Sequence, residues 1–343
     1  MKFTLDWLGD HLKTEKSAEE IADKLSVIGL EVEELIDKNA PLKQFITAKV
    51  LSAEPHPNAD KLQVLSVSTG SGEPLQIVCG APNARKDLIG VLARSGDTIP
   101  AFGEKLKDTK IRGTESQGMM CSFNELGLLG DSDGIIDLPS DTKIGISADK
   151  ILKGSVFFDA EVTSNRPDYL GVSGIARDLA SADMGEFIED KIAPIEGTIE
   201  SPIKIKLDEK TACPHFSAIY IKGVKNKESP KWLADRLTEI GISPKSFLVD
   251  ITNYILIDSC RPSHIFDADK LTGNLHIRLA KKGEKFTAIA DKKNYKLLGE
   301  ETVVADEKHI ALISGIMGAN ESGCDENTID SSGELIQKVQ FLL

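Results

Sequence analysis

The chain has 343 residues, of which 41% are hydrophobic and 28% are charged, and its formal net charge is −13. This composition is that of an ordinary globular protein, and the length predicts two or three domains. The charge excludes a protein that coats nucleic acid with its whole surface, and the lack of a signal peptide or of an apolar run near the ~20 residues of a membrane span predicts a cytoplasmic protein with no membrane partner.

The first predicted element is a short helix over residues 17–29. Ser17 and Glu20 have the spacing of a capping box, apolar residues follow at helical intervals, and Gly29 closes the helix. A helix with so little apolar surface cannot fold alone, so we expect it to pack on a later segment of the chain.

Residues 45–123 predict a small β-barrel. Four short apolar runs are separated by Gly, Pro and Asn; they cover residues 45–52, 62–69, 75–80 and 88–93. Several short strands in this length suit a closed barrel of the oligonucleotide-binding (OB) type. Residues 41–123 also carry ten Lys and Arg against eight acids, a net charge of +2 that leaves −15 for the remainder.

The second half of the chain predicts a mixed α+β domain behind a linker. A helix over 170–184 is followed by a Pro-containing acidic stretch at 189–203, where we place a domain boundary. Alternating strands are expected at 203–209 and 274–280. Between them lies a helix over 229–241, with Ser229 as N-cap and Pro230 in its first turn; its inward-facing residues should be Trp232, Leu233, Leu237 and Ile240.

The cysteines predict neither a disulfide framework nor a metal site, because they are odd in number and include no Cys-x-x-Cys pair. They are Cys79, Cys121, Cys213, Cys260 and Cys324.

Three motifs in the barrel region, at 54–67, 77–85 and 111–128, resemble a tRNA-binding domain that several tRNA ligases and tRNA-binding cofactors share. Polar side chains within them could form a rim of hydrogen-bond donors for phosphate and 2′-hydroxyl groups. These candidates are Asn58, Lys61, Asn83, Arg85, Arg112, Ser116 and Gln117. His56 lies between two prolines, where a structural role is favoured over catalysis, and Met119 and Met120 are expected in the core.

Residues 1–12, 21–35 and 158–180 resemble the split domain of the bacterial-type phenylalanine–tRNA ligase β-subunit family. The resemblance implies an OB-fold barrel inserted between the halves of a small α/β domain, within an α+β multidomain chain. The domains would be 1–40 plus 148–190, 41–147 for the barrel, and 200–343 for a B3/B4-like editing domain. Residues 165–168 are expected to cap the following helix and to pair across the two halves.

Residues 248–271 and 310–323 resemble the editing domain of the same family, which hydrolyses tyrosine wrongly joined to the phenylalanine tRNA. The resemblance places Thr252, Asn253, His264 and Glu334 in a catalytic pocket, with Gly315 and Gly318 admitting the amino acid. His264 and Asn253 would orient the ester or a water, and Glu334 would accept the phenolic hydroxyl.

The resemblance implies tRNA(Phe) and an α subunit as partners, in a heterotetramer of two α and two β subunits. ATP and Mg²⁺ would serve the full enzyme outside these residues, and no cofactor is expected in this part. Arg261, Ser263 and Ile265 depart from the family's usual residues, as does Ser246-Phe247. One alternative is therefore a non-catalytic tRNA-binding module with a decayed editing region. Another is a stand-alone tRNA-binding protein, which predicts no organised domain after residue 200.

Overall fold

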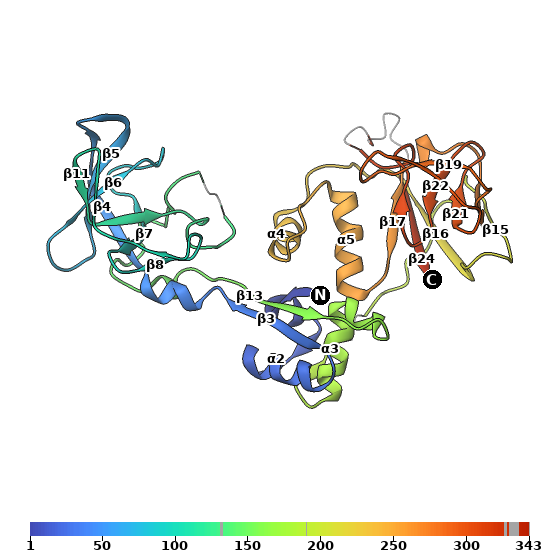
Figure 1. Cartoon of the computed structure of the whole chain (residues 1–343), viewed down its shortest axis with the longest axis horizontal. Coiled ribbons are helices and arrows are strands. Elements are labelled where there is room, and N and C mark those ends of the chain that lie inside the picture. The colour runs from blue at the N-terminus through green and yellow to red at the C-terminus, as the bar shows by residue number, and fades with distance from the viewer. Residues whose placement is uncertain (131–132, 190, 326–327, 329–335, 343) are drawn as a thin grey trace. The chain divides into compact units, whose positions relative to one another are not determined.

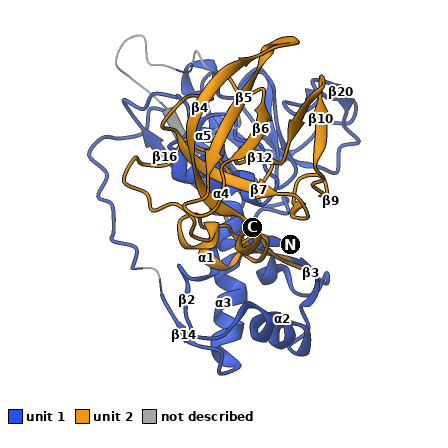
Figure 2. Cartoon of the chain, turned by 90° about the vertical axis from the view of Figure 1, so that its left-hand side faces the viewer, with its two compact units in different colours: residues 1–3, 7–33, 159–343 blue, residues 4–6, 34–158 orange. Residues whose placement is uncertain are grey.

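The computed structural model describes residues 1–130, 133–189, 191–325, 328 and 336–342. The chain divides into two compact units (Figure 2): unit 1 holds residues 1–3, 7–33 and 159–343, and unit 2 holds 4–6 and 34–158. The three-domain boundaries expected from the sequence stay a prediction. No helix in the described part of the chain is long and apolar enough to cross a membrane.

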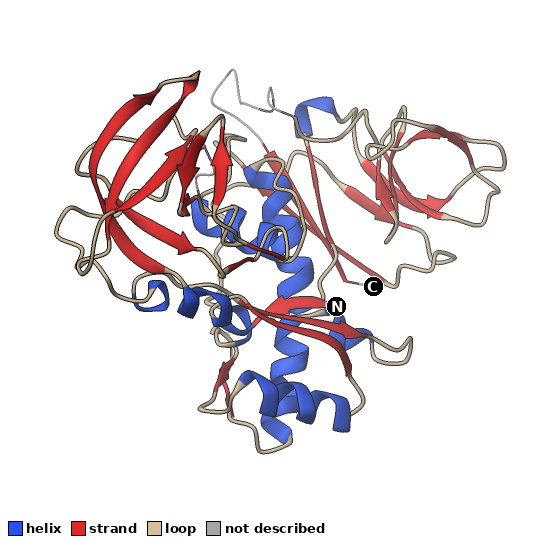
Figure 3. Ribbon diagram, turned by 60° about the vertical axis from the view of Figure 1, so that its left-hand side comes forward, coloured by secondary structure: helices blue, strands red, loops and turns tan. Residues whose placement is uncertain are grey.

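Unit 2 is built around a nearly closed five-stranded barrel, which confirms the predicted OB-like fold (Figure 3). Its antiparallel strand order is β12-β7-β4-β5-β6. The strands are β4 (Ile46–His56), β5 (Ala59–Ser68), β6 (Leu75–Cys79), β7 (Ile89–Arg94) and β12 (Gly118–Cys121). The backbone N–H of Gln117 donates to the carbonyl of Gln76 at 2.9 Å, which links the two ends of the strand order.

The barrel interior is filled by alternate residues of its strands, as the period of two in a β-strand requires. Val50, Leu65 and Leu92 are fully buried there. Gly90 on β7 allows a close approach, because a Cβ at this position would lie 2.8 Å from the carbonyl oxygen of Ile136. Two small hairpins complete unit 2; they are β8 (Thr98–Ile99) with β9 (Glu104–Lys105), and β10 (Thr109–Ile111) with β11 (Thr114–Ser116).

The N-terminal segment and residues 156–187 fold together. The sheet β1-β13-β3 joins β1 (Lys2–Thr4), β13 (Val156–Glu161) and β3 (Glu31–Asp37), while β2 (Leu12–Lys13) pairs with β14 (Glu186–Phe187). The helices are α1 (Leu5–Leu8), α2 (Ala18–Val27) and α3 (Val172–Ser181), with a 3-10 turn, η3 (Pro167–Leu170), before α3. Ser17 and Glu20 form the expected capping box of α2. The predicted packing of this helix on a later segment is confirmed by its contacts with α3.

The rest of unit 1 is a mixed α+β domain, as predicted, and its existence contradicts the stand-alone tRNA-binding alternative. Its larger sheet has the order β15-β18-β21-β22-β23, and a second sheet has the order β16-β24-β17. The strands are β15 (Ile205–Leu207), β16 (His215–Ile221), β17 (Ser263–Phe266), β18 (Leu275–Leu279), β21 (Thr302–Ala305), β22 (Ile310–Ile313), β23 (Met317–Gly318) and β24 (Ile336–Leu342), beside a hairpin of β19 (Lys285–Thr287) and β20 (Asn294–Lys296). The helices α4 (Lys231–Glu239) and α5 (Phe247–Ser259) precede β17, and α5 packs on it (Figure 1).

Two expectations for α4 were wrong. Pro230 occupies the N-cap position, and the hydroxyl of Ser229 instead donates to Asp250 Oδ2 at 2.6 Å. Trp232 does not face inward, because 57% of it is exposed, whereas Leu233 and Leu237 are buried. A buried carboxylate without a donor costs more free energy than an uncapped helix end, so the Ser229 hydroxyl bonds Asp250. The strand expected at 203–209 is also shorter and exposed on both sides.

Residues 166–178 form an ion-pair network instead of a helix cap. Arg166 pairs with Asp168 and Asp178, and Arg177 pairs with the same two carboxylates. The N-cap position of α3 is Gly171, so the expectation that 165–168 cap this helix was wrong. Hydrogen bonds from Arg166, followed by those from Arg177, hold the pKa of Asp168 at about 2 against burial.

This network predicts a pH dependence of stability. A carboxyl whose folded pKa is lowered contributes stability above its ordinary pKa of 3.8, and the contribution is lost as pH falls towards about 2. Asp168→Asn should therefore lower the free energy of unfolding at pH 7 and flatten its decline between about pH 5 and pH 2. Urea unfolding across this pH range measures both effects. Asp23→Asn, which removes an exposed carboxylate of α2, is the control, and equal slopes for the two variants would contradict the assignment.

Candidate functional site

A cavity of about 270 Å³ in unit 1 gathers five of the six residues predicted for the editing-type site. Thr252 and Asn253 come from α5, His264 from β17, Gly315 from the turn between β22 and β23, and Gly318 from β23. Three segments separated by up to 66 positions thus meet at one cavity. The sixth residue, Glu334, lies outside the described residues.

His264 supplies the imidazole of this cavity. Its ring packs edge-on against Phe266, with centroids 4.7 Å apart and planes at 69°. Its Nε2 is buried and has no hydrogen-bond partner among the residues that the structure describes. Burial lowers the pKa of His264 from 6.5 to about 4, so the ring is neutral near pH 7.

The glycines of the 315–318 turn permit the close fit of the ring. A Cβ on Gly318 would lie 2.2 Å from Cε1 of His264, a distance that no side chain at 318 could occupy without moving the imidazole. Gly315 has a φ of 68°, a conformation that favours glycine. The backbone of this turn therefore forms one wall of the cavity.

The helix α5 forms the opposite wall. Leu256 follows Thr252 by four positions and Asn253 by three, so it shares the cavity-facing side of the helix with both. The hydroxyl of Thr252 donates to the carbonyl of Val249 at 2.6 Å, which leaves its lone pairs to face the cavity. Asn253 adds a carboxamide, which can both donate and accept.

Other lining residues were missed by reasoning from the sequence. They are Leu256, Pro262, Ser263, Leu312, Ile316 and Met317. Leu256 could have been found from its helical spacing to Thr252 and Asn253, and Pro262 and Ser263 from their proximity to His264. The pairing of β22 with β23, which brings Leu312 opposite Gly318, had no sequence signal of comparable strength.

Three of the predicted tRNA contacts lie together at one edge of the barrel. The side-chain amide of Asn58, at the turn between β4 and β5, donates to the carbonyl of Arg112 at 3.2 Å. His56 accepts from the N–H of Asn58 at Nδ1, so its Nε2–H donates to the carbonyl of Ile111, which is the structural role predicted for it. Lys61 and Arg112 are exposed, and neither makes an ion pair within the described part of the chain.

The side chains of the other four candidates bond to other residues of the barrel region. Asn83 donates to the carbonyl of Ile135 at 2.8 Å and accepts from its N–H at 2.9 Å, and Arg85 pairs with Asp137 at 2.7 Å. The buried hydroxyl of Ser116 accepts from Val78, and the side chain of Gln117 accepts from the N–H of Gln76. Asn83 thus fixes the chain at Ile135, and Ser116 and Gln117 bond to strand β6.

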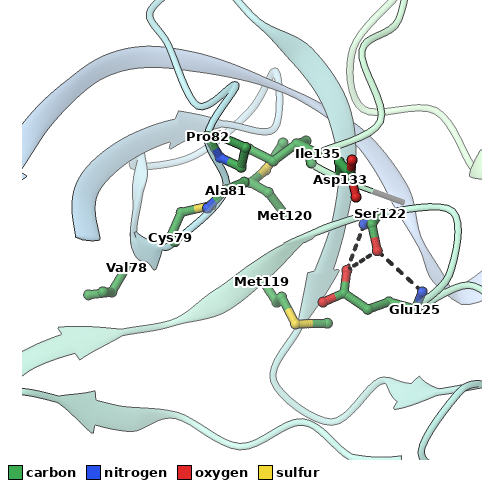
Figure 4. Close-up of a pocket in the computed structure, with 12 residues that line it drawn as sticks. Val78, Cys79, Ala81, Pro82, Met119, Met120, Ser122, Glu125, Asp133 and Ile135 are labelled. Carbon is green, nitrogen blue, oxygen red and sulfur yellow. Dashed lines mark hydrogen bonds between the residues drawn. The ribbon is translucent and has the colours of Figure 1, made fainter. Parts of the chain in front are cut away.

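A second cavity of about 410 Å³ lies on the barrel (Figure 4). Met119, Met120 and Pro82 give it apolar walls, and one carboxylate oxygen of Glu125 accepts from the N–H and hydroxyl of Ser122. Glu125 and Asp133 make its lining acidic, so this cavity repels phosphate and suits an apolar or amino-bearing group.

No group of three or more His, Cys, Asp and Glu suited to a metal ion occurs among the described residues.

Two family models match two separate parts of the chain. Residues 45–147 match the family described as "Putative tRNA binding domain", and residues 212–332 match the family described as "B3/4 domain". The first range contains the barrel, and the second contains the cavity around His264.

Two relatives that align with nearly the whole of this chain have the same name. The chain is 48% identical over 332 residues to the "Phenylalanine--tRNA ligase beta subunit" of Bradyrhizobium diazoefficiens, and 49% identical over 335 residues to that of Rhodospirillum rubrum. Each alignment covers 96% of this chain, but only 41% and 42% of the relatives, so the chain spans about two-fifths of their length. A crystal structure of an N-terminal fragment of the phenylalanyl-tRNA synthetase β subunit of Pyrococcus horikoshii is 18% identical, with a TM-score of 0.32, and covers 55% of this chain and 56% of the fragment.

The environment of His264 predicts an imidazole that stays neutral through the physiological range. Because burial penalises its charged form, the unfolded chain takes up the proton near pH 6.5 before the folded chain does. NMR titration of the His264 ring should show a midpoint near pH 4, and stability should decline as pH falls from about 6.5 to about 4. His264→Asn assigns the signal. A midpoint near 6.5 would show that the ring is open to water.

Proposed function

The chain is homologous to the N-terminal portion of phenylalanine–tRNA ligase β subunits, and from this premise we propose that it binds tRNA(Phe) and hydrolyses tyrosine attached to it in error. The barrel would hold the tRNA, and the cavity around His264 would take the esterified amino acid. This activity would belong to a cytoplasmic enzyme built from two α and two β subunits.

The observation that carries the proposal is the convergence on one cavity. Thr252, Asn253 and His264, together with the glycines at 315 and 318, were singled out from separate motifs, and they line the same 270 Å³ space. A buried imidazole nitrogen with no partner among the described residues costs free energy, and a bound substrate or water would relieve that cost. This arrangement supports a binding role for the cavity.

The chemistry would be hydrolysis of an ester. Water adds to the ester carbonyl carbon, the bond to the terminal ribose oxygen breaks, and the proton of the water passes to that oxygen. A neutral His264 with a pKa of about 4 is too weak a base to remove the proton at pH 7. We therefore assign its Nε2 the task of orienting the water or the ester, and the carboxamide of Asn253 the task of stabilising the oxyanion.

Recognition of tyrosine would need a group that bonds the phenolic hydroxyl. A site that pairs with this hydroxyl leaves its own polar group unpaired when phenylalanine enters, and phenylalanine is thereby rejected. The family resemblance gives this contact to Glu334, which lies outside the described residues. Aminoacylation with ATP and Mg²⁺ would belong to other parts of the whole enzyme.

The tRNA would be held through its phosphate backbone, at the edge of the barrel that carries Lys61 and Arg112. These cations are exposed, and Asn58 fixes the turn that bears Arg112. The acidic cavity on the barrel argues against phosphate contact there. A chain with a net charge of −13 is thus proposed to bind RNA through a small basic region.

One observation favours a second candidate, a tRNA-binding module with a decayed editing region. The hydroxyl proton of Thr252 is used within its own helix, and Ser263 and Ile265 flank the imidazole where the family usually has other residues. The assay below separates this candidate from an editing hydrolase.

The editing proposal predicts a loss of deacylation on substitution of His264. With tyrosyl-tRNA(Phe) as substrate, His264→Ala should lower kcat by roughly a hundredfold, because a water or ester that is out of place by about 1 Å can cost this much. Gly318→Ala should have a similar effect, because its Cβ displaces the ring. Glu284→Gln, which weakens a partly buried ion pair with Arg278 outside the cavity lining, is the matched control and should keep the wild-type rate. Background-level release by the wild-type chain, with or without an α subunit, would favour the second candidate.

The barrel proposal predicts a change in the salt dependence of tRNA binding. The double variant Lys61→Ala, Arg112→Ala should make the plot of log binding constant against log salt concentration shallower. Its slope should fall in magnitude by about two, one for each lost phosphate contact. Lys49→Ala is the matched control, since this lysine already pairs with Asp87 at 2.8 Å. An unchanged slope in the double variant would place the tRNA elsewhere.

A further inference from the structure

The helix α5 presents a second polar face that the proposed chemistry does not use. Thr252, Asn253 and Leu256 line the cavity, whereas Tyr254 and Asp258, which are four positions apart, lie on another face. Any rotation or sliding of the helix moves both faces together. Contacts made by Tyr254 and Asp258 therefore bear on the position of Thr252 and Asn253.

Residues near the N-terminus bind this second face directly. The indole Nε1 of Trp7 donates to Asp258 Oδ1 at 2.8 Å, and His11 Nε2 lies 2.8 Å from the same oxygen. The Trp7 ring also stacks on Tyr254, with centroids 5.2 Å apart and planes at 6°. Trp7 is fully buried, and His11 and Asp258 are only 3% and 9% exposed.

The helix α4 closes this cluster from another side. Arg236 lies over the Trp7 ring at 5.3 Å and pairs with Asp10, and Trp232 meets Tyr254 edge-on at 5.6 Å. Trp232, which was expected to face inward, makes this contact while 57% of it stays exposed. The cluster thus joins three segments of unit 1 around one carboxylate.

The end of α5 is fixed as well. Cys260 ends the helix in a left-handed conformation, with a φ of 52°, and its thiol donates to the carbonyl of Pro167 at 3.0 Å. Gly171 packs so closely that a Cβ there would lie 2.6 Å from the backbone nitrogen of Cys260. His264 follows four positions later, so the start of its strand is set from the same point.

We propose that Asp258, held by Trp7 and His11, is a positioning residue that fixes the rotation and axial position of α5 and so aligns Thr252 and Asn253 with His264. Its catalytic consequence rests on the proposed editing function, whereas its effect on the helix does not. The residue touches no substrate; it acts through the helix that carries the cavity wall.

The environment of Asp258 keeps the carboxyl charged. Burial acts to raise its pKa, but the hydrogen bonds from His11 and Trp7, with the charges of His11 and Arg236, outweigh burial and leave the pKa below its ordinary value. An ionised carboxylate accepts both donors at once, and bonds to an ionised group are about twice as strong as neutral ones. Loss of the oxygen that accepts both bonds should therefore loosen the helix, and loss of the charge alone should loosen it less.

The kinetic test compares Asp258→Ala, Asp258→Asn and the control Glu284→Gln in deacylation of tyrosyl-tRNA(Phe). We expect Asp258→Ala to lower kcat by roughly tenfold or more with little change in KM, because misplacement by about 1 Å can cost this much. Asp258→Asn keeps an acceptor oxygen for Trp7 and His11, and should recover much of the rate. A wild-type kcat for Asp258→Ala would overturn the proposal.

A second readout does not depend on activity. The chain has two tryptophans, Trp7 and Trp232, so Trp232→Phe leaves Trp7 as the sole tryptophan probe. In this background, Asp258→Ala should increase acrylamide quenching of Trp7 and speed amide hydrogen exchange across residues 251–264, while Glu284→Gln should change neither.

The two readouts separate two kinds of failure. If the wild-type chain releases no tyrosine, the proposed function fails, and exchange across 251–264 alone decides the role of Asp258. If exchange there is unchanged in Asp258→Ala, the carboxylate does not position α5, whatever the activity. Faster exchange in the same peptides, restored by Asp258→Asn, would support it.

Discussion

The close approach of the His264 ring to the backbone at Gly318 is the constraint on which the cavity depends. A side chain at 318 would meet the imidazole at 2.2 Å, so only glycine lets β17 and the β22–β23 turn come this near each other. The same closeness removes water from the ring, which lowers its pKa to about 4 and leaves Nε2 buried. Geometry and electrostatics at the site therefore have one origin.

The position of α5 is the second requirement, because it brings the other wall to this ring. Its contacts with Trp7 and His11 span 251 and 247 positions in sequence, and its C-terminal end packs against Gly171. The segments at the start of the chain and around residue 170 thus have a structural task beyond their own small fold. In the proposed function, that task is to hold one wall of the editing cavity steady.

The barrel shows how internal bonding restricts a surface. Asn83, Ser116 and Gln117 have the residue types expected of RNA contacts, yet their side chains bond backbone groups at Ile135 and on strand β6. Ser116 is buried, and a buried polar group must be paired within the protein before it can serve an external ligand. The exposed cations at Lys61 and Arg112 are left as the basic part of the predicted set, which suits a protein of acidic composition.

Local features were predictable from the sequence, and long-range ones were not. The capping box at Ser17 and Glu20 and the barrel strands between Gly and Pro residues depend on neighbours along the chain, so pattern reasoning found them. The residues around His264 were found through a family resemblance. Ser229, Trp232 and Asp258 depend on partners far away in sequence, and no periodicity marks such partners. The measurement that tests the account most directly is a crystal structure of the chain with adenosine that carries tyrosine through a stable 3′-amide. The account predicts the tyrosyl group between Asn253 and the 315–318 turn, with His264 Nε2 hydrogen-bonded to it or to a bridging water. The analogue bound elsewhere, with the cavity unchanged, would contradict it.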